Sequence, residues 1–419
     1  EENMINIKPF RGFRPAKGLE DKIACKPYDV IDYDEALEIG KDNPLSFVHV
    51  IRPEIDMPDN TDPYSKEVYI KAKKNLENFI DKGYLIEEDK SVFYIYRQIV
   101  NNRAQNGIVT CVSIDDYGEG RIKKHELTRV DKEQDRINHF YYSEAHTEPV
   151  FLFYKRNEDL KKFILEWTTN HNCIYDFASQ DGVKQMLWVV DDEDSIKYLQ
   201  ELFSSMDNLY IADGHHRTAS AYKVGLKKRQ ENPNYTKEEE FNYSMSVVFS
   251  DDELCIKPYN RAVRDLNGYS EEEFLERVSE KFNIKLCSTL GQPMIEHEFT
   301  MILGENSYKL TPIEGVLDAN DKIASLDVSI LQDNILSPIL GIEDPRTDTR
   351  IEFFGGDGIM DTVKNRLNTD MKVAFLLYPT QIKDITAVSD IGKVMPPKST
   401  WFEPKLMSGL FIHKFEPSK

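Results

Sequence analysis

The sequence predicts a mixed α/β protein that ends in a second, more antiparallel α+β portion. In the first half, short apolar runs alternate with amphipathic helical patterns, and in the second half the runs pair as candidate hairpins. At 419 residues the chain is also longer than a single hydrophobic core usually grows. We therefore expect two regions, an N-terminal α/β region at 1–265 and a C-terminal α+β region at 266–419.

The first region alternates strand patterns with helix patterns. Val68, Ala72, Leu76 and Phe79 recur at helical spacing within 64–82. This predicts an amphipathic helix that ends at the following glycine. The other elements expected, in chain order, are strands at 92–100 and 150–154, a helix marked by Leu160, Phe163, Ile164 and Trp167, a strand at 185–190, a helix at 192–203, a strand at 209–212 and a helix from 218.

The second half opens with two candidate hairpins. One would join 242–249 to 253–258 through Ser250–Asp251–Asp252, and the other would join 298–303 to 307–312 through Gly304–Glu305–Asn306. Between them, Ser270 and Glu273 have the spacing of a capping box that opens a helix reaching 282. A strand at 350–354 and a helix at 359–367 follow.

Charge and composition limit the functions to consider. The chain has 53 Lys and Arg against 73 Asp and Glu, and its net charge of −20 opposes non-specific binding to DNA or RNA. A small nucleotide in a locally basic pocket remains compatible with this charge. No apolar run approaches the roughly 18 residues of a membrane helix, 1–8 lacks the apolar core of a signal peptide, and five scattered cysteines suggest reduced thiols. We expect a cytoplasmic protein.

The most informative motif is Asp213-Gly214-His215-His216-Arg217, which directly follows an apolar strand and precedes a helical stretch. A glycine there permits a sharp turn, and the N–H groups and dipole at a helix start favour an anion. Arginine and two histidines at this place describe a phosphate site. The alternative is structural, with Asp213 capping the helix and both histidines on its solvated first turn.

Two further segments carry chemistry of the same kind. Glu126 could act as a general base toward a substrate hydroxyl with His125 donating to phosphoryl oxygens, or the pair could be an inert strand end. Near the C-terminus, Lys398, Ser399, Thr400 and Lys405 offer ammonium and hydroxyl donors; the alternative is a rigid turn with solvated lysines. Arg11 and Arg14 form another candidate anion clamp.

Common nucleotide and zinc motifs are absent from the sequence. Lys398-Ser399-Thr400 follows a proline where a P-loop needs glycine, and Arg129 occupies the second histidine position of a zinc-protease HExxH. No histidine or cysteine spacing predicts a resident metal. Mg²⁺ carried in with a nucleotide is the more plausible ion, with Asp213 as its candidate ligand.

The chain resembles the domain of unknown function 1015 family. The resemblance rests on KPFRGFRP (8–15), KPYDVID (26–32), NPLSFVHVIRPE (43–54), IKKHELT (122–128), IADGHHRTA (211–219) and MPPKSTWFEPK (395–405). The DGHHR segment is also similar to a signature of ParB/sulfiredoxin-like proteins, a group that includes nucleotide-dependent enzymes and free serine kinases. This likeness implies a ParB/sulfiredoxin-like α/β core.

Together these features lead us to expect a phosphotransfer enzyme, kinase-like or phosphatase-like, that uses ADP or ATP with Mg²⁺ on a small hydroxylated metabolite. Serine or phosphoserine is the substrate that the resemblance implies. The expected catalytic residues are Glu126, His125, His215 and His216, and the expected phosphate ligands are Asp213, Gly214, Arg217, Lys398, Ser399, Thr400 and Lys405. The alternative function is a non-catalytic regulator that binds a nucleotide or another effector.

Overall fold

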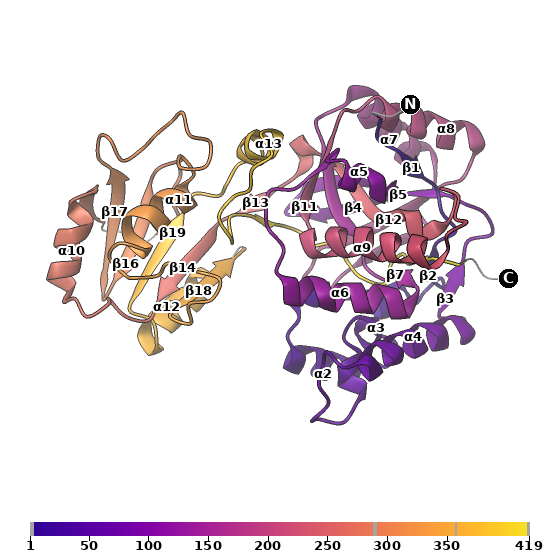
Figure 1. Ribbon diagram of the computed structural model, residues 1–419, viewed down its shortest axis with the longest axis horizontal. Coiled ribbons are helices and arrows are strands. Elements are labelled where there is room, and N and C mark those ends of the chain that lie inside the picture. The colour runs from indigo at the N-terminus through magenta and orange to yellow at the C-terminus, as the bar shows by residue number, and fades with distance from the viewer. Residues whose placement is uncertain (1–3, 288–290, 357, 417–419) are drawn as a thin grey trace. The chain divides into compact units, whose positions relative to one another are not determined.

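The computed structural model describes residues 4–287, 291–356 and 358–416, which divide into two compact units (Figure 1). Unit 1 comprises the chain up to Lys124, Thr128–Leu254 and the chain from Pro404 onward; unit 2 comprises His125–Leu127 and Cys255–Glu403. The division therefore lies at 254/255, before the boundary that we expected after residue 265. The reason is that β14 (Tyr259–Val263) belongs to the sheet of unit 2.

Unit 1 is built on a nine-stranded mixed sheet of order β6-β11-β8-β12-β5-β4-β10-β9, with β1 paired to β5. The pairs β11·β6 and β12·β8 are parallel, and the remaining pairs are antiparallel. The mixed α/β class is thereby confirmed. In chain order the strands are β1 Ile7–Lys8, β4 Phe93–Val100, β5 Arg103–Ser113, β6 Ile122–Lys123, β8 Val150–Tyr154, β9 Tyr175–Ala178, β10 Lys184–Val190, β11 Leu209–Asp213 and β12 Tyr243–Ser250.

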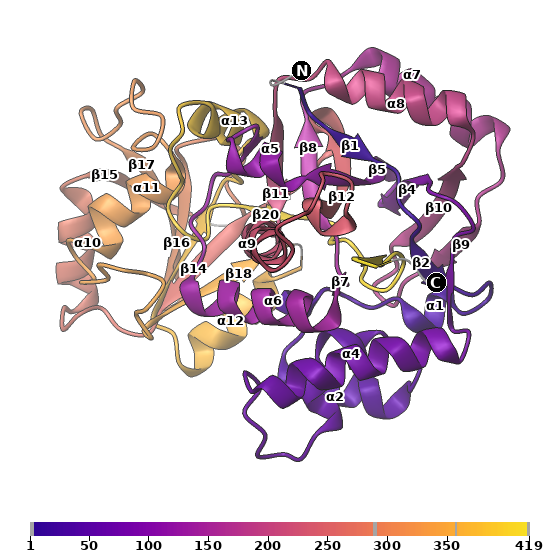
Figure 2. The ribbon, with the colours of Figure 1, turned by 45° about the vertical axis from the view of Figure 1, so that its right-hand side comes forward.

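Helices surround this sheet (Figure 2). Two of the hydrophobic cores of unit 1 lie beneath them. One core joins the sheet to the paired helices α7 and α8, and the other gathers the short helices of the N-terminal segment around α4. The amphipathic helix expected at 64–82 is α4. The helices of unit 1 are α1 Glu20–Ile23, α2 Tyr33–Asp42, α3 Val48–Ile51, α4 Lys66–Asp81, α5 Ile114–Gly118, α6 Val130–Ser143, α7 Glu158–Asn170, α8 Glu193–Ser204 and α9 His215–Glu231.

One face of helix α9 is buried, and small residues on that face let its neighbours approach closely. Ala219, Ser220, Ala221 and Gly225 are all buried, and a Cβ at Gly225 would lie only 2.3 Å from Ile114 Cδ1. Helix α6 packs along α9, and the Ser220 hydroxyl donates to the carbonyl oxygen of Glu133 on α6. The start of α9 is therefore held rigidly at the end of β11.

Unit 2 contains a six-stranded antiparallel sheet of order β15-β17-β16-β19-β14-β18. The hairpin expected at 298–312 is formed by β16 and β17, and the capping box of Ser270 and Glu273 opens α10. The hairpin and the capping box are confirmed, but the helix ends at Ser279 and does not reach 282, where a strand begins. The strands are β14, β15 Phe282–Cys287, β16 Phe299–Leu303, β17 Asn306–Pro312, β18 Ile351–Gly355 and β19 Val373–Leu377; the helices are α10 Glu271–Ser279, α11 Asp327–Leu331, α12 Met360–Thr369 and α13 Ile382–Asp390.

The first expected hairpin is wrong. Strand β12 is followed by a 3₁₀ turn at Asp251–Glu253, and the next strand, β13 (Ile256–Lys257), pairs with β20 (Trp401–Phe402). The physical reason is that β12 is bonded along both edges, to β5 and to β8, so it has no edge left for a hairpin partner.

No helix of the described residues has the length and apolar character needed to cross a membrane. The five cysteines are all free thiols, of which Cys25 and Cys111 are buried.

Candidate functional site

The turn from β11 to α9 is the strand-turn-helix that the sequence predicted for DGHHR. Strand β11 ends at Asp213, and Gly214 has φ 91° and precedes the first helical residue, His215. A Cβ at Gly214 would lie 3.1 Å from Arg217 Nε, so both the backbone angle and the space favour glycine. No side chain caps this helix start. The local geometry is that of an anion-binding helix N-terminus.

Asp213 lies between two cations of unit 1. Its carboxylate oxygen Oδ2 is 3.5 Å from Lys405 Nζ and 3.5 Å from Arg217 Nη2. Burial acts to raise the pKa of Asp213, but Lys405 and Arg217 outweigh it and lower that pKa to about 2. Asp213 is thus ionised and neutralised by its neighbours. Lys405 comes from the C-terminal segment, which the fold brings back beside DGHHR.

Arg217 is buried, with 2 % of its surface exposed. Its Nη1 donates to the carbonyl oxygen of Pro149 at 2.6 Å, and its Nη2 also lies 3.6 Å from Asp29 Oδ2. Among the described residues, Nε has no hydrogen-bond partner. The guanidinium therefore binds the two flanking carboxylates, Asp29 and Asp213, and holds them under the turn.

A second buried charge network lies next to Arg217. Glu148 accepts hydrogen bonds from Tyr28 N and Ser408 Oγ, both at 2.9 Å, and lies 3.5 Å from Arg136 Nη1. Arg136 also pairs with Asp135 at 2.8 Å. Burial raises the pKa of Glu148, against the opposing charges of Arg217 and Arg136. These groups fix the interior behind the site.

The histidines of the motif have different surroundings. His215 is buried, whereas His216 is half-buried and its Nε2 accepts a hydrogen bond from the backbone N–H of Arg129 at 3.0 Å. Burial lowers the pKa of His216, although Asp29 and Glu133 oppose this. Burial therefore favours the neutral form of the His216 imidazole. This contact also ties the residue after IKKHELT to the DGHHR turn.

The IKKHELT and MPPKST motifs meet within unit 2. His125 Nε2 lies 3.2 Å from Thr400 Oγ1, and the backbone N–H of Met395 donates to the carbonyl oxygen of His125 at 2.7 Å. In the same turn, Lys398 is exposed with φ 60°, and Ser399 Oγ donates to the carbonyl oxygen of Pro396. Two segments far apart in the sequence are thus joined.

The candidate clamp of Arg11 and Arg14 is occupied by glutamates. Arg11 Nη2 lies 3.4 Å from Glu87, and Arg11 Nε donates to the carbonyl oxygen of Glu88. Arg14 pairs with the Glu88 carboxylate and stacks beside Tyr175. Both arginines hold the N-terminal segment against the end of β3 (Leu85–Glu87) and the residue after it.

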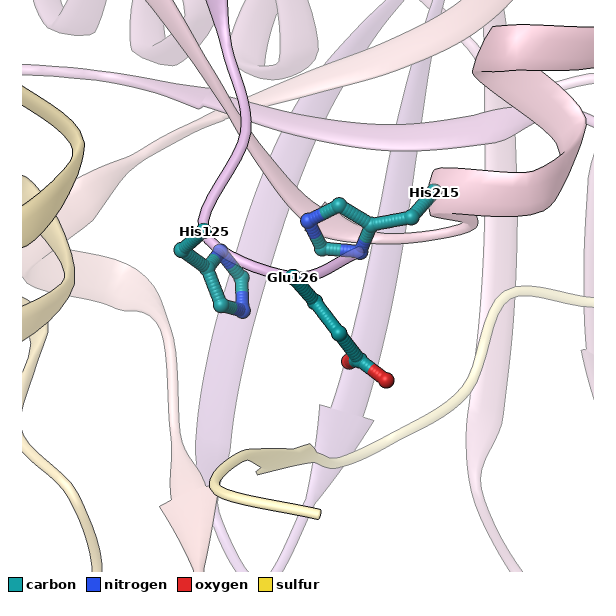
Figure 3. Close-up of side chains that lie close together, drawn as sticks. All are labelled: His125, Glu126 and His215. Carbon is teal, nitrogen blue, oxygen red and sulfur yellow. The ribbon is translucent and has the colours of Figure 1, made fainter. Parts of the chain in front are cut away.

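Metal ligation requires atoms of a suitable type. Of the described residues, His125, Glu126 and His215 offer histidine nitrogens and a carboxylate oxygen that divalent metals accept (Figure 3). His215 opens α9, and His125 and Glu126 lie on the loop between β6 and α6. Asp213, our candidate Mg²⁺ ligand, already has two cationic partners, so its capacity for a metal is reduced.

A polar pocket of about 520 Å³ lies at the other end of α9. Two ion pairs lie among its charged groups: Arg229 binds both carboxylate oxygens of Asp115, and Arg121 binds Asp116.

Sequence reasoning missed Asp29, Glu148 and Arg129. Asp29 lies in KPYDVID, a motif to which we assigned no chemistry from the sequence. Glu148 stands in Thr147-Glu148-Pro149, where no pattern distinguishes it from the many surface acids of this chain. Its burial, at 1 % exposed, is visible only in the fold.

Comparison with solved structures finds distant neighbours. A mutant of free serine kinase in complex with ADP is 15 % identical, with 70 % of this chain and 87 % of that chain covered and a TM-score of 0.36. SbnI with C-terminal truncation from Staphylococcus aureus is 11 % identical (72 % and 85 % covered, TM-score 0.37). A conserved hypothetical protein from Pyrococcus furiosus is 14 % identical (72 % and 95 %, TM-score 0.34). No curated protein matches.

A family model matches residues 7–329, which is most of the chain. The matched range spans the motifs from KPFRGFRP to IADGHHRTA, including the β11–α9 turn. The chain belongs to the family described as Protein of unknown function (DUF1015).

Proposed function

We propose that this protein is a nucleotide-dependent phosphotransfer enzyme that acts on a small hydroxylated metabolite. The observation that carries the proposal is the start of α9, where an uncapped helix N-terminus follows a glycine turn and has Lys405 and Arg217 beside it. Helix N–H groups and a nearby ammonium group are suited to phosphate oxygens. Because the cations are few and local, they suit a small anion better than a polyanion.

In this proposal the residues of the turn have distinct roles. The N–H groups of the first turn of α9 and the Lys405 ammonium bind nucleotide phosphate, and His216 donates through the nitrogen that does not face Arg129. Arg217 keeps Asp29 and Asp213 in place beneath them, since its guanidinium is already engaged by both carboxylates. Mg²⁺ enters with ADP or ATP as the nucleotide complex.

The chemical step needs a base and a second set of donors. Glu126 accepts the proton of the acceptor hydroxyl while the hydroxyl oxygen bonds to phosphorus. At the same time the bond from phosphorus to the leaving oxygen of the nucleotide breaks. His125, Lys398, Ser399 and Thr400 supply donors to the transferred group. Serine is the first acceptor to test, because free serine kinases belong to the group whose signature the DGHHR motif resembles.

Calorimetry tests the binding half of the proposal. ADP, ATP and CTP are titrated into the whole chain with and without Mg²⁺. Lys405→Met is expected to lower the nucleotide affinity roughly tenfold or more, because a charge-assisted contact is lost. Lys414→Met is the matched control, because Lys414 lies in the same C-terminal segment with its ammonium over the Phe13 ring. Wild-type protein that binds no nucleotide would refute the proposal.

Phosphorus NMR with serine and other hydroxylated acceptors tests the transfer half. Glu126→Gln is expected to leave nucleotide affinity nearly unchanged and to lower turnover by about 10² to 10⁴, the usual range for loss of a general base. A protein that binds nucleotide yet phosphorylates or dephosphorylates none of the acceptors would instead support the regulatory alternative.

A further inference from the structure

Arg261 of β14 is a buried cation whose charge is not balanced by a carboxylate. It is 3 % exposed, and its Nη1 and Nη2 donate to the carbonyl oxygens of Tyr259 and Lys398 at 2.7 and 2.9 Å. Within the described parts of the chain, no acidic side chain forms an ion pair with it. Burial lowers the pKa of Arg261 to about 10.

Other buried arginines of this protein have carboxylate partners. Arg136 pairs with Asp135 and Glu148, and Arg217 pairs with Asp29 and Asp213. An isolated buried charge is costly, and carbonyl dipoles compensate it only in part. The two carbonyl contacts also use two of the five N–H donors of Arg261, so three donors remain for an anion.

A second cation lies on the same face of the sheet. The exposed ammonium of Lys398 is 5.9 Å from the centre of the Tyr259 ring, and Tyr259 and Arg261 are alternate residues of β14, whose side chains point to one face. Phe353, opposite Arg261 on β18, has its ring 5.3 Å from the guanidinium. The Phe353 ring limits water around the buried guanidinium, which strengthens its attraction for an anion.

We infer that unit 2 binds a phosphate-bearing anion through Arg261 and Lys398. The guanidinium would take two phosphate oxygens with its free donors, and the flexible ammonium of Lys398 would close over the anion from the exposed turn. This subsite consists of residues of unit 2, whereas the DGHHR turn belongs to unit 1. The subsite shares Lys398 with the proposed function, and binding there requires no catalysis.

Pyrophosphate is the probe, titrated calorimetrically into the whole chain and into single variants. Arg261→Met and Lys398→Met are each expected to weaken one binding event roughly tenfold or more, the usual effect of losing a hydrogen bond to a charged group. Arg277→Met is the matched control in unit 2, because this arginine stacks on Tyr269. Lys405→Met tests whether pyrophosphate binds in unit 1 instead. We expect this variant to leave the pyrophosphate binding that depends on Arg261 and Lys398 unchanged.

The folding of Arg261→Met is checked by its melting temperature without pyrophosphate. We expect this temperature to be equal to or above that of wild type, since the variant removes an unbalanced buried charge. Exposed Lys398 gives a second variant in which folding is not at risk. Wild-type pyrophosphate affinity in both variants, or loss of all pyrophosphate binding in Lys405→Met alone, would overturn the inference.

The outcome is distinguishable from that of the proposed function. Pyrophosphate binding that depends on Arg261, in a protein that binds no nucleotide at Lys405, would support the inference and refute the enzyme. Nucleotide binding that depends on Lys405, together with a pyrophosphate affinity that does not change in Arg261→Met, would support the proposed function and refute the inference.

Discussion

His139 is a buried histidine of unit 1 that the fold keeps neutral. It lies on α6 with 1 % of its surface exposed, and its Nε2 donates to the carbonyl oxygen of Val50 at 2.9 Å. Burial and the nearby Arg136 charge lower the pKa of His139 to about 3. An unfolded histidine titrates near 6.5, so the unfolded chain takes up a proton that the native state refuses.

This difference sets a pH dependence of stability. Because the pKa is lower in the folded state, the contribution of His139 is fully present above about pH 6.5 and is lost as pH falls toward 3, by up to about 1.4 kcal/mol per pH unit. In urea titrations, His139→Gln should show a shallower loss of unfolding free energy between pH 6 and 4. An identical slope in both proteins would contradict the assignment.

Single residues also show how far sequence reasoning reaches into the site. Gly214 and the residues around it were predictable, because a strand, a glycine and a helix follow one another within a few residues. The partners Asp29 and Glu148 were not, since each is set by tertiary packing of segments distant in sequence. Lys405 was identified as a candidate from its motif, but its place beside Asp213 is a property of the fold.

At the scale of elements, the β11–α9 turn makes a prediction about glycine. Gly214→Ala should lower the free energy of unfolding by about 1–2 kcal/mol, because alanine is strained in the left-handed backbone of this position. Contact between the new Cβ and the Arg217 guanidinium should add to this loss. Gly120→Ala is the matched control, because Gly120 has φ 80° but no neighbour within 4 Å of a Cβ. Chemical denaturation measures both. Equal losses in the two variants would show that the Arg217 contact contributes nothing.

Elements with a local signal were predicted well, and pairings were not. Helix α4 and the capping box of α10 follow from the periodicity and spacing of nearby residues. Strand β12 was expected to turn back on β13, yet all its residues are buried between β5 and β8. Which strands become neighbours depends on long-range contacts, and a run of apolar residues does not encode its own partner.

For the whole molecule, the important feature is that the chain returns to unit 1 after Glu403. The returning segment buries six apolar side chains: Leu406, Met407, Leu410, Phe411, Ile412 and Phe415. At about 1.5–3 kcal/mol each, their burial rivals the 5–15 kcal/mol that usually separates folded from unfolded domains. Unit 1 therefore depends on the last residues of the chain.

A chain ending at Glu403 tests this dependence. Hydrogen exchange followed by mass spectrometry should show that amides of β8, β11 and β12 lose protection, because their unit lacks its last segment. Amides of β16, β17 and β19 in unit 2 serve as the internal control and should stay protected. Protection of unit 1 at the wild-type level would refute the predicted role of the segment.

The same return of the chain has a consequence for biosynthesis. A ribosome makes unit 1 up to Leu254 well before Pro404 emerges, and Cys255–Glu403 of unit 2 is synthesised in between. Domains usually fold in N-terminal order during translation. Here all segments of unit 2 are synthesised before the last segment of unit 1. The nascent unit 1 therefore has an incomplete core until that segment emerges, and chaperones are most needed at this stage.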